Sequence, residues 1–198
     1  MQRMNSKVAA AAALSAVLAL AGCISLGGKP PAQLLNLTAS ATAPAGAAAS
    51  GNADSAIAVS DVEAPQKIDV ARVPVDTSNS TLAYLQDAQW VDKPARLFTR
   101  LLSDTLRARG NHLVVSGTDL EDAAATKLSG TLQAMDYDAT SGSVVVRFDA
   151  VLQTKDGAIR SKRFEATVSG VAAQAVPVGA ALNQAANEVA TQVADWVG

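Results

Sequence analysis

The sequence predicts a single α+β domain, in which a mostly antiparallel sheet carries two amphipathic helices packed on one face. Three consecutive strands are expected between Leu128 and Val168, joined by turns too short for parallel crossovers. Apolar residues recur at helical spacing over Pro94–Arg109 and again over Val178–Val197, where Asn183 and Asn187 are expected on the solvent side. Because an apolar sheet face must be covered, the two helices are expected to bury it.

Residues 1–22 are predicted to form a lipoprotein signal peptide that is removed. Arg3 and Lys7 give it a positive start, and the apolar run from Val8 to Leu20 is too short to span a bilayer. Leu20-Ala21-Gly22-Cys23 then resembles a bacterial lipobox, and Cys23 is the only cysteine in the sequence. The lipobox implies that the Cys23 sulfur takes a diacylglyceryl group and that its freed amine is acylated, which would anchor the protein to a lipid bilayer.

Two other interpretations of this segment remain open. It could be a buried, alanine-rich core helix that ends in an incidental cysteine, or an ordinary secretory signal in which Cys23 has no role. We favour the lipoprotein, because charge, apolar length, small residues and cysteine would otherwise have to coincide by accident.

The residues after Cys23 bear on the destination of such a lipoprotein. In Gram-negative lipoproteins, Asp directly after the cysteine typically retains the protein at the inner membrane. Here Ile24 and Ser25 follow the cysteine. The resemblance therefore implies the cell outer membrane, with the lipid-anchored body facing the periplasm.

The charge balance argues against a nucleic-acid partner. Removal of residues 1–22 leaves 14 basic and 18 acidic side chains, a net charge of −4, with no basic stripe. No disulfide can form within the mature chain, since no second cysteine exists. Stability must therefore come from one ordinary apolar core.

The mature chain is predicted to begin with a lipidated, flexible tether over residues 23–32. This segment contains Gly27-Gly28-Lys29-Pro30-Pro31, which is incompatible with a helix. The domain is assigned to residues 33–198 and starts with the apolar patch Leu34-Leu35-Asn36-Leu37. A low-complexity insert at about residues 39–54 follows and is predicted to be a mobile loop; the alternative, a weak alanine helix, is interrupted by Pro44, Gly46 and Gly51.

Alternating and periodic patterns locate the next elements. Short strands are expected at Ile57–Val62, Val70–Val75, Thr81–Leu85 and His112–Val115. The helix over Pro94–Arg109 has Asp92 as a candidate N-cap and Gly110 as a candidate left-handed C-cap. Arg100 and Asp104 lie one turn apart on its polar side, where they can pair.

The hairpin around Asp156-Gly157 can be tested for register. A two-residue turn would place Phe148 opposite Glu165, which mixes core and surface. A three-residue loop over residues 155–157, with Gly157 left-handed, instead aligns three apolar pairs: Phe148 with Phe164, Val146 with Ala166 and Val144 with Val168. The other face then sets Arg147 opposite Glu165 and Asp149 opposite Arg163. In the preceding strand, Asp136 is expected beside Arg147.

No catalytic, cofactor-binding or metal site is predicted. The sole histidine, His112, is expected to be structural, and one histidine cannot supply a zinc site. Glu121, Asp122, Asp136 and Asp138 are interpreted as solvent-exposed carboxylates. A hydrolase that uses Asp136 and Asp138 is a poorly supported alternative, and no phosphate-binding glycine motif occurs.

The two tryptophans could belong to the core or to a binding surface. Trp90 and Trp196 are expected to cap the helix–sheet core, and a recognition role is the alternative.

The order of these segments resembles the ABC-type transport auxiliary lipoproteins, the family that includes the auxiliary lipoprotein of the paraquat-inducible Pqi system. The matching features span nearly the whole mature chain: the lipobox, Leu34-Leu35-Asn36-Leu37, Ile57-Ala58-Val59, Val73-Pro74, Leu82-Ala83-Tyr84, Trp90 before the helix with Leu97, Leu101 and Leu106, the strand Val144–Leu152, the Asp-Gly turn, Arg163-Phe164 and the alanine-rich terminal helix. Two features depart from the family, which usually has an aromatic residue in the early patch and lacks the 39–54 insert.

This resemblance implies a non-enzymatic lipoprotein that serves as an auxiliary component of an ABC/MCE-type lipid or solute transport system. Its implied partners are the periplasm-spanning MCE-domain protein and the ABC transporter subunits, and no cofactor is implied. Self-association into a ring is part of the same hypothesis. The alternative is a stand-alone structural or assembly lipoprotein of the cell envelope.

Overall fold

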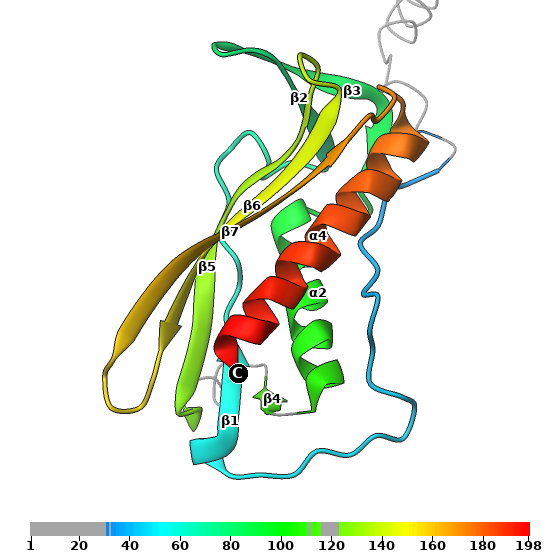
Figure 1. The fold of residues 1–198 in the computed structure, drawn as a ribbon. Helices are drawn as coiled ribbons and strands as arrows, with labels where there is room; N and C mark the ends of the chain where they lie inside the picture. Colours follow the sequence, from blue (N-terminus) through cyan, green and yellow to red (C-terminus); the bar gives the residue numbers. More distant parts are fainter. Residues whose placement is uncertain (1–30, 32, 111, 116–122) are drawn as a thin grey trace, which may run out of the picture. The chain divides into compact units, whose positions relative to one another are not determined.

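The computed structural model describes residues 31, 33–110, 112–115 and 123–198, so the expected signal peptide, Cys23 and almost all of the tether lie outside the described residues. Within them, seven strands form one sheet that is accompanied by two long helices (Figure 1). In chain order the elements are the 3-10 helix η2 (Ala53–Ser55), β1 (Ala56–Val59), β2 (Arg72–Ser78), β3 (Thr81–Gln89), α2 (Pro94–Arg109), β4 (Leu113–Val115), β5 (Thr126–Asp138), β6 (Ser143–Gln153), β7 (Ile159–Ser169) and α4 (Ala175–Val197).

The sheet is mixed, so the prediction of a mostly antiparallel sheet is wrong. β5 pairs antiparallel with β6 along one edge, and its other edge pairs in parallel with both β1 and β2. Val59 lies opposite Leu128 near one end of β5, and Val75 lies opposite Tyr137 near the other. β1 and β2 thus act as one interrupted strand beside β5, while β4 extends the sheet from β1 in parallel and β3 extends it from β2 antiparallel.

The β6–β7 hairpin has the predicted register. Phe148 lies opposite Phe164, and Val146 lies opposite Ala166. Gly157 has φ +82°, the left-handed conformation that the three-residue loop requires. On the other face, Arg163 Nε donates to Asp149 Oδ1 at 2.6 Å, and Arg147 pairs with Glu165.

Helix α2 begins and ends at the predicted residues, with Gly110 left-handed at φ 71°. Its N-cap is Lys93 rather than Asp92. Asp92 instead lies 3.7 Å from both Arg96 and Arg100. At this position the positive end of the helix dipole also stabilises its carboxylate. The predicted Arg100–Asp104 pair is therefore wrong.

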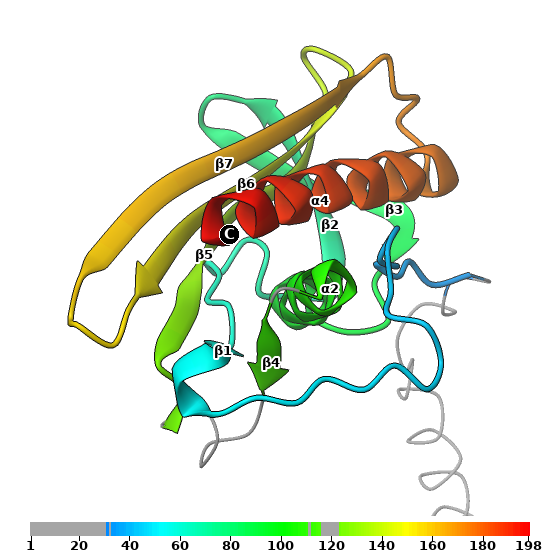
Figure 2. The same ribbon diagram turned by 60° about the horizontal axis from the view of Figure 1, so that its bottom comes forward.

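Aromatic side chains join both helices to the sheet. Phe98 of α2 lies 5.1 Å from Phe148 of β6, and Trp196 of α4 lies 5.6 Å from Phe164 of β7, measured between ring centroids. Phe148 and Phe164 oppose each other and so share one face of the sheet. Figure 2 shows α4 lying along β6 and β7, with α2 beside it.

An extended segment after the expected tether is fastened to α4. Thr38 N donates to Asn183 Oδ1 at 2.8 Å, and Ser40 N donates to Asn187 Oδ1 at 2.7 Å. Asn187 is only 9% exposed, although helical spacing placed it on the solvent side. Residues 41–52 then continue without helix or strand toward β1, along the blue path in Figure 1.

Candidate functional site

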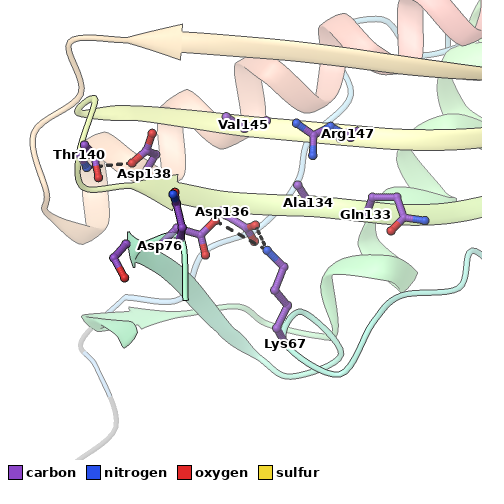
Figure 3. A pocket seen from close by; sticks show the side chains of 11 residues that line it. Lys67, Asp76, Gln133, Ala134, Asp136, Asp138, Thr140, Val145 and Arg147 are labelled. Carbon is purple, nitrogen blue, oxygen red and sulfur yellow. Dashed lines mark hydrogen bonds and ion pairs between the residues drawn. The ribbon is translucent and has the colours of Figure 1, made fainter. Parts of the chain in front are cut away.

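A polar groove of about 550 Å³ lies on the face of the sheet opposite the helices (Figure 3). Alternation along the strands sets this face: Met135 and Val146 are fully buried toward the helices, and their neighbours Asp136 and Arg147 point the other way. The charged lining residues are Lys67, Asp76, Asp136, Asp138 and Arg147. The groove therefore presents both signs of charge on strands that the core holds rigid.

Lys67 and Asp136 form the central pair of the groove. Lys67 comes from the segment between β1 and β2, and its Nζ donates to the Asp136 carboxylate and lies 3.8 Å from Asp76. Figure 3 shows the lysine side chain pointing from its loop toward Asp136 and Asp76. Asp136 is only 3% exposed. Burial raises the pKa of the Asp136 carboxyl above its ordinary value, an effect that the Lys67 hydrogen bond and charge oppose and the nearby Asp76 charge reinforces.

A β-bulge in β5 places the carboxylates of Asp136 and Asp138 on the groove side of the sheet. Leu132 lies opposite Phe148 but Ala134 lies opposite Arg147, so Gln133 is an extra residue on β5. The bulge reverses the faces of β5, because a one-residue shift turns every later side chain over. Without it, Asp136 would point into the apolar core.

The prediction that Asp136 lies beside Arg147 is corrected by this register. Asp136 lies opposite Val145, and its ion pair is with Lys67 rather than Arg147. Arg147 pairs with Glu165 across the sheet. The interpretation of Asp136 as a solvent-exposed carboxylate is also wrong, whereas Asp138 accepts hydrogen bonds from Ser141 and Thr140 that lower its pKa.

The groove is suited to hydrogen bonding and charge contact. Its lining holds no histidine or cysteine, and its lysine is already paired with a carboxylate. In the described part of the chain, no group of three or more His, Cys, Asp or Glu side chains is placed to hold a metal ion.

The other residues singled out from the sequence lie apart from the groove. The ring Nε2 of His112 is 2.5 Å from the backbone oxygen of Gly198, a contact that joins β4 to the end of α4. Trp90 is 1% exposed and belongs to the core, and Trp196 packs on Phe164 at the core margin. Cys23, Glu121 and Asp122 lie outside the described residues.

Sequence reasoning missed Lys67 and the two asparagines of α4. Each contacts a segment far away in the chain, so no local sequence pattern marks it.

None of the helices in the described ranges is long and apolar enough to cross a bilayer.

The sequence identifies the family of the chain, through a match that covers nearly the whole described unit. A family model described as the ABC-type transport auxiliary lipoprotein component matches residues 36–194. The chain belongs to this family. The match begins within the early leucine patch and ends inside α4, so the auxiliary-lipoprotein domain contains every strand of the sheet.

Solved structures share the fold of this auxiliary-lipoprotein domain. The protein XCC0632 from Xanthomonas campestris, assigned to the family DUF330, has a TM-score of 0.70 at 18% identity, over 84% of this chain and 94% of that one. An uncharacterized protein has a TM-score of 0.63 at 15% identity, over 73% of this chain and 93% of that one. The PelC dodecamer from Paraburkholderia phytofirmans has a TM-score of only 0.39 at 15% identity, over 73% of this chain and 92% of that one, which is too low to bear on the fold or the assembly of this chain. No curated protein matches the chain.

Proposed function

We propose that this chain is a non-enzymatic accessory subunit of an ABC/MCE-type transport system that moves lipid or another solute across a Gram-negative envelope. The observation that carries the proposal is the family match over residues 36–194. The groove supports it, because its lysine is held in an ion pair with Asp136 and its lining has no histidine or cysteine. A surface of this kind can bind a partner.

The anchor is the first part of the proposal to test. Cys23 is proposed to carry the acyl chains and to hold the domain at the outer membrane, facing the periplasm. Growth in labelled palmitate should label the wild-type chain and leave Cys23→Ser unlabelled. An unlabelled wild-type chain would overturn the anchor.

Membrane sorting has a matched variant in the next residue. On separation of the two membranes by density, the wild-type chain should fractionate with the outer membrane. Ile24→Asp, which keeps Cys23 and the whole domain, should move to the inner-membrane fraction. If the wild-type chain is found in the inner membrane, the outer-membrane proposal is wrong and the anchor stands.

The partner proposal is tested by recovery from detergent extracts. The tagged lipoprotein should bring down an MCE-domain protein and the subunits of an ABC transporter, and Cys23→Ser expressed at the same level controls for binding after lysis. A ring of copies would give a mass several times that of one chain in the same extract. Recovery of the lipoprotein without any transport component would favour the alternative, a stand-alone structural or assembly lipoprotein.

A further inference from the structure

Exposed apolar side chains gather at the end of the domain where the chain enters it. Among the described residues, Leu34 and Val91 are each 50% exposed and Val176 is 64% exposed. We call these three side chains the entry rim. Leu34 and Val91 are neighbours, since Val91 N donates to the oxygen of Leu35 at 2.9 Å.

The start of α4 completes the entry rim. Leu35 packs so closely on Gly179 that a Cβ added to the glycine would lie 2.5 Å from Leu35 Cδ2. From there the segment runs along α4, because Thr38 binds Asn183 one turn further on. Val176 lies three residues before Gly179 on the same side of α4, close to the point where Leu35 meets the helix.

The two segments that meet at the entry rim carry no charge. Residues 30–53 contain no acidic or basic side chain, and neither do residues 166–187. Charged residues border these segments: Asp92 and Lys93 follow Val91 directly, Lys93 pairs with Asp69 at 2.8 Å, and Arg72 and Asp87 line a hollow together with Pro31. Exposed Arg160 and Lys162 lie near the other end of α4, where Arg160 stacks over Trp196. Exposed aliphatic side chains that gather where two uncharged segments meet indicate a contact surface, which charged residues of the neighbouring elements border.

We propose that the entry rim rests on the bilayer that holds Cys23, an inference that depends on the proposed lipid anchor. The length of chain outside the described domain supports this occupant. Leu34 follows Cys23 by eleven residues, which reach about 40 Å even when fully extended. The domain therefore stays within about 40 Å of the anchored residue, and the entry rim is the exposed apolar surface that lies nearest to the anchor along the chain.

The acyl chains hold the domain, and the entry rim orients it. Interfacial apolar side chains sit about 5–10 Å into the headgroup and acyl boundary, which three aliphatic side chains at one end can reach. The sheet and α4 then stand up from the membrane. At 1.5 Å per residue the 23 residues of α4 span about 35 Å, so Trp196 and Arg160 project into the periplasm.

Two equally exposed aliphatic residues give a matched test. Val176 is 64% exposed and Ile159 is 66% exposed. Val176 lies at the start of α4, whereas Ile159 lies at the start of β7, next to Arg160 and therefore near the end of α4. Val176→Cys and Ile159→Cys are each labelled with a polarity-sensitive fluorophore in the full-length, acylated protein, in which Cys23 has no free thiol. Both are reconstituted into vesicles of phosphatidylethanolamine and phosphatidylglycerol that contain a nitroxide-labelled lipid.

The expected result is that the probe at 176 shifts to the blue and loses most of its emission to the nitroxide, while the probe at 159 does neither. Equal, weak quenching at both positions in protein that floats with the vesicles would overturn the inference and leave the anchor intact. A blue shift at 176 without nitroxide quenching would also overturn it, because a protein surface would then cover the rim. Failure to float, with an unmodified Cys23 by mass, would overturn the anchor and the inference together.

Discussion

Asp136 and Asp138 lie two residues apart on one face of β5, yet their surroundings shift their acidities in opposite directions. Burial raises the pKa of Asp136 above its ordinary value of 3.8 despite its contact with Lys67. Hydrogen bonds from Ser141 and Thr140 lower the pKa of Asp138 below the same value. The two carboxylates must therefore contribute oppositely to the pH dependence of stability.

The first prediction compares Asp136→Asn with Asp138→Asn. As pH rises above 3.8, the unfolded chain loses the Asp136 proton before the folded chain does, so this group makes the wild-type protein less stable. For Asp138 the folded chain loses its proton first, so the wild-type protein gains stability as pH rises toward 3.8 and above. Relative to wild type, Asp136→Asn should therefore gain unfolding free energy with rising pH and Asp138→Asn should lose it. Urea unfolding from below pH 3.8 to neutrality measures both, and slopes of the same sign would contradict the assignment.

The second prediction concerns the buried amide of Asn187. Its Nδ2 donates to the oxygens of Thr38 at 2.9 Å and Asn183 at 2.8 Å, and its Oδ1 accepts from Ser40 N. Asn187→Ala leaves these groups without their partner at a site that is 9% exposed, which should lower the free energy of unfolding by about 1–3 kcal/mol. Urea unfolding checks the value. Glu188→Ala, on the exposed side of the same helix, should change it by only a few tenths of a kcal/mol, and equal effects would mean that the amide contacts add nothing.

These residues mark the limit of local sequence reasoning. Helical spacing places Asn187 on the polar side of α4, which is correct. The expectation that this side faces solvent is wrong, because residues 38–40 cover it. Alternation places Asp136 on a polar face, which is right, but the cover that Lys67 supplies comes from a segment far upstream. Trp90, expected to cap the core, is buried there at 1% exposure.

At the scale of elements, the β6–β7 hairpin was predictable because its determinants are local. A left-handed glycine, an apolar face and two complementary charge pairs all select one register, and the structure has it. The parallel pairing of β1 and β2 with β5 was not predictable in this way. Those strands meet β5 across more than sixty residues of sequence, and no turn chemistry specifies which partner a short strand takes.

The third prediction tests how closely β5 and β6 approach. A Cβ on Gly130 would lie 2.2 Å from the Asp149 oxygen and 2.6 Å from Phe148 Cζ, so a backbone atom and a core ring would both have to move. Gly130→Ala should therefore cost about 3 kcal/mol, the upper end of ordinary overpacking. Gly157→Ala is the control, because nothing lies within 4 Å and only its φ of +82° is strained, which costs about 1 kcal/mol. Urea unfolding of both variants decides, and a smaller loss at Gly130 than at Gly157 would mean that the strands can separate there.

At the scale of the whole molecule, the order of segments was enough to predict the family, and the family model matches residues 36–194. What the order could not supply is the difference between the two ends of the domain. The end with the entry rim is formed when residues 34–40 lie on the start of α4, and the other end is formed when the β6–β7 hairpin lies near the last turn of α4. The first end depends on a contact between Thr38 and Asn183, which are 145 residues apart, and the second on a contact between β7 and α4.

The last prediction locates the boundary between anchor and domain. Residues 31–198 form one compact unit, and its first backbone bond within the described residues is from Leu35 N to Gln89 O at 2.7 Å. A chain that begins at Pro31 should therefore unfold at the same urea concentration as one that begins at residue 23 and carries no acyl chains. The shorter chain keeps every residue of the compact unit. A chain that begins at Ala41 loses the burial of Leu37, worth about 1.5–3 kcal/mol, and the hydrogen bonds to Asn183 and Asn187, worth about 1 kcal/mol each. Its midpoint should fall well below that of the longer chain. Equal midpoints would mean that residues 31–40 belong to the tether, and that the entry rim is not held by the fold.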